Sequence, residues 1–158
     1  KWEINKYEQS YKKASSLTDI NVELKLLLTF LTDLSKKTSM RIIITTGTVK
    51  TKIIKELIAI SKKIDHHVYE LSLNNTTCYL VVNESFFSTC HLISKSSIMI
   101  SCHGAFTHIA SNYKIRIIDV IEQNKKNQYY RLTSHMINYE YLYRDSFNKL
   151  SKEIINKI

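Results

Sequence analysis

Two histidines near a glycine, His103 and His108 beside Gly104, are the residues best suited to bind a charged ligand. They follow a short apolar run at residues 98–100, and a helical pattern begins at Gly104. The first turn of a helix presents free N–H groups and the positive end of its dipole, which favours a phosphate. A histidine there can bind phosphate oxygens and stabilise a leaving group as charge develops. The segment therefore predicts a phosphate site at His103, Gly104, Ala105 and His108. The alternative is one buried, hydrogen-bonded histidine and one on the surface.

Four further polar or glycine residues follow predicted strands. Thr46 and Gly47 follow one apolar run, and Asp119 and Glu122 end another. Because the carboxyl ends of parallel strands share one rim of a sheet, we expect these residues to line a cleft with the two histidines. A carboxylate at Asp119 or Glu122 can hold ribose or sugar hydroxyls, or merely cap a loop. We expect Gly104 to matter because a side chain would block a phosphate and because glycine adopts a positive φ.

The elements that must position these residues alternate between apolar strands and amphipathic helices. This pattern predicts an α/β fold, a Rossmann-like open, mainly parallel sheet with helices on both faces. We expect one sheet to contain the buried strands, at residues 40–45, 79–82, 98–101 and 115–119. Helices are expected at residues 21–37 (capped by Asp19 or Asn21), 50–63, 85–95, from 104 and from 146. The chain is predicted to be a single domain, with an irregular arm at 1–18, a polar loop at 123–128 and a C-terminal helical extension at 129–158.

The composition sets broad limits on function. The chain has 158 residues and a net charge of +9, but its lysines are spread in ones and twos rather than in a basic block. This charge suits a phosphorylated ligand, an acidic membrane surface or nucleic acid, and a solvated lysine-rich surface accounts for it equally well. Three cysteines without a Cys-x-x-Cys motif suit a reducing compartment, and no apolar run is long enough for a membrane span. Because the chain starts without a methionine, we expect it to be a piece of a longer protein.

Other chemistries have weaker support. Cys90-His91 and Cys102-His103 recur at a spacing of twelve, but neighbouring residues on a strand point to opposite faces, which does not suit a zinc site. Cys102 beside a histidine is conceivable as a nucleophile, although nothing else in the sequence calls for one. The absence of an Asp-x-Asp pair predicts no bound metal, and the absence of Gly-x-Gly-x-x-Gly gives no support for a dinucleotide.

Several of these segments together resemble a known family. Residues 101–105 read Ser-Cys-His-Gly-Ala, residues 108–111 read His-Ile-Ala-Ser, and residues 118–121 read Ile-Asp-Val-Ile. A second set of matching residues lies further on, namely Arg131, Thr133, His135, Asn138, Tyr139, Tyr143 and Arg144. This pattern resembles the C-terminal, donor-binding half of GT-B glycosyltransferases, in particular a divergent branch of the heptosyltransferase-like family. The chain departs from the family at the glycine turn, which lacks the acidic residue, and at Leu132, where the branch has tryptophan.

The resemblance implies a function. It implies a domain that binds a nucleotide-diphosphate sugar, with no cofactor and no metal, and transfers the sugar to a glycan or lipid-linked acceptor of the cell-surface type. Lys1, in the pair Lys1-Trp2, would lie near the donor phosphates. The acceptor site and the catalytic base would belong to an N-terminal GT-B domain that this chain lacks, so the catalytic residues stay unknown.

We expect a cytoplasmic protein without a nucleic-acid partner, with peripheral contact at the inner membrane face left open. The alternatives are a non-enzymatic module that binds RNA or a protein through the tyrosine-rich C-terminal stretch, and a degenerate glycosyltransferase half.

Overall fold

The computed structural model describes residue 20 and residues 22–47, 51–73 and 76–158. The predicted arm at 1–18, Lys1 and the proposed caps Asp19 and Asn21 lie outside the described residues. The elements are, in chain order, α2 (Leu24–Lys37), β1 (Ile42–Thr46), α3 (Lys52–Ala59), β2 (Lys62–Lys63), β3 (Val68–Leu73), β4 (Thr76–Val82), α4 (Phe86–Ser94), β5 (Ile98–Cys102), α5 (Ala105–Asn112), β6 (Arg116–Ile121), the 3-10 turn η1 (Gln123–Lys125), α6 (Lys126–Thr133), β7 (Tyr139–Tyr143) and α7 (Phe147–Lys157).

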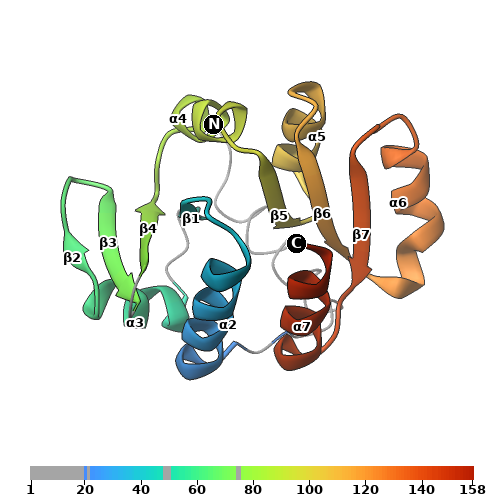
Figure 1. Cartoon of the computed structure of the whole chain (residues 1–158). Helices are drawn as coiled ribbons and strands as arrows, with labels where there is room; N and C mark the ends of the chain where they lie inside the picture. The colour runs from blue at the N-terminus through green and yellow to red at the C-terminus, as the bar shows by residue number, and fades with distance from the viewer. Residues whose placement is uncertain (1–19, 21, 48–50, 74–75) are drawn as a thin grey trace, which may run out of the picture.

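The strands form two open sheets. The first sheet has the order β1-β4-β3-β2, with β1 and β4 parallel and the other two pairs antiparallel. The second sheet has the order β5-β6-β7 and is parallel throughout. Helices cover both faces, with α4 and α5 on one side and α2, α3 and α7 on the other (Figure 1). This confirms the predicted α/β, Rossmann-like open fold.

The prediction of one continuous sheet was wrong. Strands β1 and β4 belong to the first sheet, and β5 and β6 belong to the second. Two pockets separate β1 from β5: one is lined by Ile43 and Thr45 together with residues 98–102, the other by residues 41–43 together with 97–98 and Ile100. The edge strands β1 and β5 thus line the same two pockets, but no ladder of hydrogen bonds joins them.

Strand β1 is also less buried than its apolar sequence predicts. Its residues alternate between half-buried and exposed, and Ile43 is 42% exposed. The alternation follows from the pleat of a strand, which turns successive side chains to opposite faces. One face of β1 packs against the core through Ile42 and Ile44, and the other faces the pockets beside β5.

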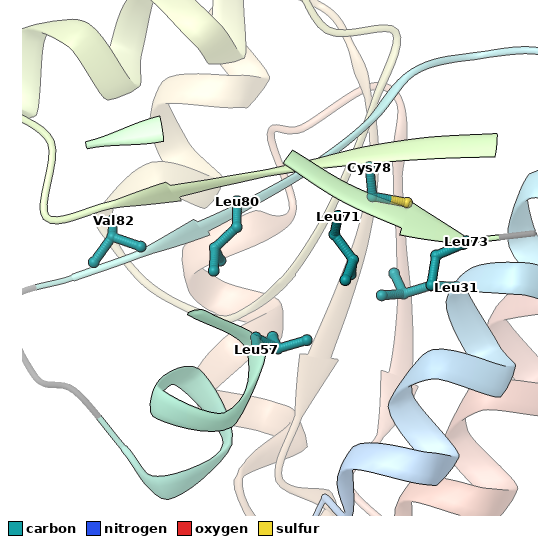
Figure 2. Packing of buried hydrophobic residues seen from close by; sticks show 7 residues of the cluster. All are labelled: Leu31, Leu57, Leu71, Leu73, Cys78, Leu80 and Val82. Carbon is teal, nitrogen blue, oxygen red and sulfur yellow. The ribbon is translucent and has the colours of Figure 1, made fainter. Parts of the chain in front are cut away.

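The hydrophobic core lies on both sides of the sheets. Under the first sheet, Leu31 of α2 and Leu57 of α3 pack against buried residues of β3 and β4, which are Leu71, Leu73, Cys78, Leu80 and Val82 (Figure 2). Under the second sheet, Leu150 and Ile154 of α7 pack against Ile118, Val120 and Leu142. Phe30 of α2 contacts both groups and lies edge-on to Phe147, with ring centroids 5.7 Å apart. This helix layer therefore crosses from one sheet to the other.

The opposite face of the second sheet carries the helix that matters for the site. Ala110 of α5 is fully buried, and it belongs to one core cluster with Ile117 of β6 and Ile93 of α4. The small alanine lets α5 lie close to β6, which fixes the loop between β5 and α5 over the carboxyl end of the sheet. This loop contains His103 and Gly104.

Four predicted boundaries need correction. The helix expected at 50–63 ends at Ala59, and Lys62–Lys63 pair with β3 instead. Strand β4, expected at 79–82, begins three residues earlier, at Thr76. The predicted polar loop at 123–128 holds η1 and the start of α6. The extension at 129–158 is not purely helical, because Tyr139–Tyr143 form the edge strand of the second sheet. Of the described helices, none has the length and apolar character needed to span a bilayer.

Candidate functional site

The loop after β5 is held by Thr107, a fully buried residue in the first turn of α5. Its hydroxyl accepts a hydrogen bond from the backbone N–H of Gly104 at 3.3 Å and lies 3.3 Å from the hydroxyl of Ser101 in β5. One side chain thereby ties the end of the strand to the start of the helix. The amino end of α5 is fixed beside His103 as a result.

The side chain of His103 is held by the buried carboxylate of Asp119 in β6. Its Nδ1 atom lies 2.6 Å from Oδ2 of Asp119, and the hydroxyl of Tyr139 donates to the same oxygen at 3.0 Å. Because Oδ2 is an acceptor for Tyr139, Nδ1–H of His103 is the donor in the shorter contact. Within the described residues, no hydrogen bond uses Nε2, the other nitrogen of the ring. A histidine held in this way by a carboxylate is oriented for proton transfer or anion binding at Nε2.

The burial of Asp119 makes this contact electrostatically important. The residue is fully buried, and burial raises the pKa of its carboxyl above the usual value, while the hydrogen bond and charge of His103 oppose that rise. A buried carboxylate is stable only when it is paired and hydrogen-bonded. Here His103 and Tyr139 provide the hydrogen bonds to this carboxylate. Burial also raises the pKa of Tyr139, with the charge of Asp119 as the next cause, so the phenol remains a donor at neutral pH.

Two aromatic rings lie against His103, and a third ring lies against one of these two. His108, one turn into α5, lies edge-on to it with centroids 5.4 Å apart, and Tyr129 of α6 lies edge-on at 4.7 Å. His135 stacks against His108 at 6.2 Å. The structure therefore brings the two predicted histidines together, and it adds a third histidine from the turn after α6.

A second cation lies at the end of β7. The Nη2 atom of Arg144 is 3.3 Å from the sulfur of Cys102, and Nη1 is 3.6 Å from Oε1 of Glu122. The Arg144 side chain is 16% exposed and that of Glu122 is 7% exposed. Arg144 therefore lies beside the residue that precedes His103. Burial and the charges of Glu122 and Asp119 raise the pKa of Tyr129, and Arg144 opposes this rise.

The predicted carboxylates occupy different places from those expected. Strand β6 continues to Ile121, so Asp119 lies inside the strand rather than at its end. The expectation that the strand ends at Asp119 was wrong, because the apolar run continues through Val120 and Ile121. Glu122 does follow the strand, but it is buried beside Arg144. The chain thus places Asp119 against His103 and Glu122 beside Arg144.

The glycine turns are also placed by the structure. Gly104 and Ala105 border the pocket between β1 and β5, a space of about 350 Å³ that Thr45 lines from the other side. Thr46 and Gly47 end β1, where the Thr46 carbonyl accepts from the backbone N–H of Asn83. Within the described part of the chain, no hydrogen bond or ring contact joins Thr46 or Gly47 to the histidines.

The expected positive φ at Gly104 was wrong. Its φ is −179°, an extended conformation open to any residue, and a Cβ there would meet only the carbonyl oxygen of Cys102 at 3.9 Å. The fold does not require glycine at this position. A requirement for glycine would have to come from a ligand.

Sequence reasoning missed Arg144, Tyr129 and Tyr139 as members of the site. Tyrosines recur with period two at 139, 141 and 143, which is the pattern of a strand with alternating faces. Applied to this stretch, the pattern predicts a strand at 139–143. The structure places this strand beside β6, which brings Tyr139 to Asp119 and leaves Arg144 just after the carboxyl end of the strand.

Within the described residues, no group of three or more His, Cys, Asp or Glu side chains is arranged to hold a metal ion. Comparison of the chain with protein-family models, with curated proteins and with solved structures gave no match. The fold and the site therefore define the class of protein by themselves. It is an α/β, Rossmann-like domain with a histidine-rich cluster at the carboxyl end of a parallel sheet.

Proposed function

We propose that this chain is the donor-binding half of a GT-B glycosyltransferase that resembles the heptosyltransferase-like family. The domain binds a nucleotide-diphosphate sugar, and the complete enzyme transfers the sugar to a hydroxyl of a glycan or lipid-linked acceptor. The acceptor site and the catalytic base lie in an N-terminal half outside this chain. The enzyme acts in the cytoplasm.

One observation carries this proposal. At the carboxyl end of a parallel sheet, His103 is oriented by the buried Asp119 and stands directly before the amino end of α5. In open α/β sheets ligands bind at this edge, and a helix amino end favours phosphate. His108 and Arg144 add further donors around the same point. A diphosphate needs several donors together, and this cluster supplies them without a metal ion.

The chemistry of the donor half follows from these residues. His103, His108 and the N–H groups of α5 bind the diphosphate oxygens and stabilise the negative charge that develops on them as the sugar leaves. Arg144, paired with Glu122, adds a cation beside Cys102, the residue before His103. Gly104 leaves space for the phosphates next to the backbone.

The test is calorimetry on the full-length protein that contains this chain. UDP-glucose, ADP-glucose and GDP-mannose are each titrated with and without a chelator. We expect at least one to bind, with an affinity unchanged by chelation. Failure of all three to bind, or binding that disappears with the chelator, contradicts the proposal.

A second candidate function rests on exposed aromatic residues. Tyr130 is 68% exposed, and Lys126 lies over the ring of Tyr141 at 6.0 Å from its centroid. Exposed tyrosines beside lysine can stack on RNA bases. RNA binding would weaken steeply with salt, whereas a diphosphate in a pocket gives a shallow dependence. A salt titration with a single-stranded RNA and with the nucleotide sugars separates the two functions.

A further inference from the structure

We propose that Asp119 acts as a positioning residue, which turns Nδ1 of His103 inward and makes the binding of a diphosphate at Nε2 depend on the uptake of a proton. The inference rests on the proposed function and assigns the buried carboxylate a role other than direct contact with a sugar. Its basis is the geometry of the His103–Asp119 pair.

Asp119 is too deeply placed to touch a ligand. It is fully buried within β6, and its Oδ2 atom accepts both from His103 at 2.6 Å and from Tyr139 at 3.0 Å. Its effect on anything bound at the surface must therefore pass through one of these two partners. His103 is the partner that stands in the loop after β5, with its side chain 10% exposed.

The contact also determines which nitrogen is left for the ligand. With Nδ1–H donating to Asp119, the neutral imidazole has a lone pair at Nε2, which repels a phosphate oxygen. A proton taken from the solvent by Nε2 converts this atom to a donor and gives the ring a positive charge. The new charge is stabilised on one side by Asp119 and on the other by the diphosphate. The one bond formed is Nε2–H, and its proton comes from a buffer acid, which is left as its conjugate base.

Other titratable groups face His103 and must be distinguished from it. Besides Asp119, the rings of His108 and Tyr129 lie against His103. Behind these direct neighbours, Tyr139 donates to Asp119, the charge of Glu122 acts on Tyr129, and Arg144 contacts the sulfur of Cys102. His135 lies behind His108. His108 and His135 are the other two histidines of this cluster. Variants of each histidine therefore belong in the test.

The experiment is calorimetry on the full-length protein with the nucleotide sugar that binds best. Its phosphates do not titrate near neutrality, so they take up no proton themselves. At about pH 8, where an ordinary histidine is mostly neutral, titrations in two buffers of different ionisation enthalpy give the number of protons taken up. We expect about one proton per ligand for the wild type. His103→Gln should abolish the uptake, and His108→Gln and His135→Gln should retain it.

Asp119→Asn tests the positioning role, because the amide keeps the shape and loses the charge. We expect its binding to be about tenfold weaker at pH 8, where the imidazolium needs the carboxylate, and to return toward wild type at about pH 5.5. Tyr139→Phe removes the second hydrogen bond but keeps the charge, so its proton uptake should stay unchanged. An Asp119→Asn variant that weakens binding equally at both pH values would show a structural role and overturn the inference.

The remaining outcomes are separable. A wild type that binds without proton uptake overturns the inference and leaves the proposed function intact, as does uptake that is lost with His108→Gln or His135→Gln rather than with His103→Gln. A wild type that binds none of the nucleotide sugars overturns both. Where Asp119→Asn does not fold, the proton count of the wild type and of His103→Gln decides the question.

Discussion

The 2.6 Å contact between Nδ1 of His103 and Oδ2 of Asp119 joins a loop residue after β5 to the interior of β6. It links the one fully buried carboxylate among the described residues to the residue that stands before the amino end of α5. The contact gives the loop a fixed position relative to the sheet. Substitutions of His103 at the surface of the site and of Asp119 inside the strand should therefore have related effects on ligand binding.

His108 is the direct test of the ligand side of this site. Replacing it by alanine removes a donor whose ring lies 5.4 Å from that of His103. A charge-assisted hydrogen bond contributes roughly 1.5–3 kcal/mol, so we expect at least about a tenfold loss of nucleotide-sugar affinity. Calorimetry measures the change.

His66→Ala is the matched control, because His66 is an exposed histidine on the loop between β2 and β3. It should leave the affinity unchanged. Equal effects of the two substitutions in folded proteins would show that the site has been placed wrongly.

The predictions from sequence succeeded where one pattern dominated a segment. Apolar periodicity predicted α2 and its end at Lys37, and the helix expected at 85–95 is α4, whose cap Ser85 accepts from the backbone N–H of Ser88. The turn with His103 and Gly104 was placed correctly between β5 and α5. Local chemistry sets these features, so local patterns reveal them.

The errors have a common physical origin in contacts between distant segments. Asp119 was expected at a strand end because a charge rarely lies inside a buried strand, but its contacts with His103 and Tyr139 stabilise that position. β7 was missed because tyrosine and arginine suggested a surface, while register with β6 half-buries Tyr139. Whether β1 and β5 approach closely enough to pair depends on the packing of both sheets, which no single segment encodes.

The single-sheet prediction was the strictest structural test of the glycosyltransferase resemblance, and it was not met. Strands β1 and β5 line the same two pockets, but they belong to separate hydrogen-bonded sheets. The resemblance therefore depends on the residues around His103 and on binding experiments rather than on the sheet.

Leu57 should be one of the most sensitive positions in the core. It is 1% exposed in α3, and packs with Leu31 and Leu80 under the first sheet. Leu57→Ala removes buried methyl groups and leaves a cavity, so we expect a loss of about 2–4 kcal/mol in the free energy of unfolding. Urea denaturation followed by circular dichroism measures this loss.

Ile60 provides the control three residues further on, since it is 49% exposed. Ile60→Ala should change the free energy of unfolding by less than about 0.5 kcal/mol. Similar losses for both variants would contradict the packing of α3 described above.

Glu140 should give the fold a measurable pH dependence. Its carboxylate accepts from Lys157 of α7 at 2.6 Å and from Arg116 of β6 at 2.7 Å, and these contacts hold its pKa below the usual value of 4.5. A lowered pKa in the folded state adds stability above that usual value, and this stability is lost as the pH falls through the folded pKa. Because the side chain is 36% exposed and screened by solvent, we expect Glu140→Gln to cost about 0.5–1 kcal/mol at neutral pH.

Urea denaturation at neutral and acidic pH tests this sign. The difference between wild type and Glu140→Gln should shrink toward zero in acid. Glu56→Gln, in an ion pair with Lys52 that is 3.7 Å long and largely exposed, should have little effect at either pH. A difference for Glu140→Gln that is independent of pH would argue against the ion pairs as its cause.

Cys102 offers a test of ligand binding that needs no substitution. It is exposed at the end of β5, next to His103, and its sulfur lies 3.3 Å from Nη2 of Arg144. Cys78 is fully buried, and burial raises the pKa of its thiol to about 11, so it is protonated at neutral pH and should resist alkylation. Iodoacetamide followed by peptide mass spectrometry should therefore label Cys102 first.

At a nucleotide-sugar concentration of about ten times Kd, the free fraction of the protein falls about tenfold, and labelling of Cys102 should slow by the same factor. Cys90, half-buried on α4, serves as the internal control and should keep its rate. Slowing at Cys90 as well would indicate a general tightening of the fold, and unchanged labelling of Cys102 under saturating ligand would place the bound diphosphate elsewhere.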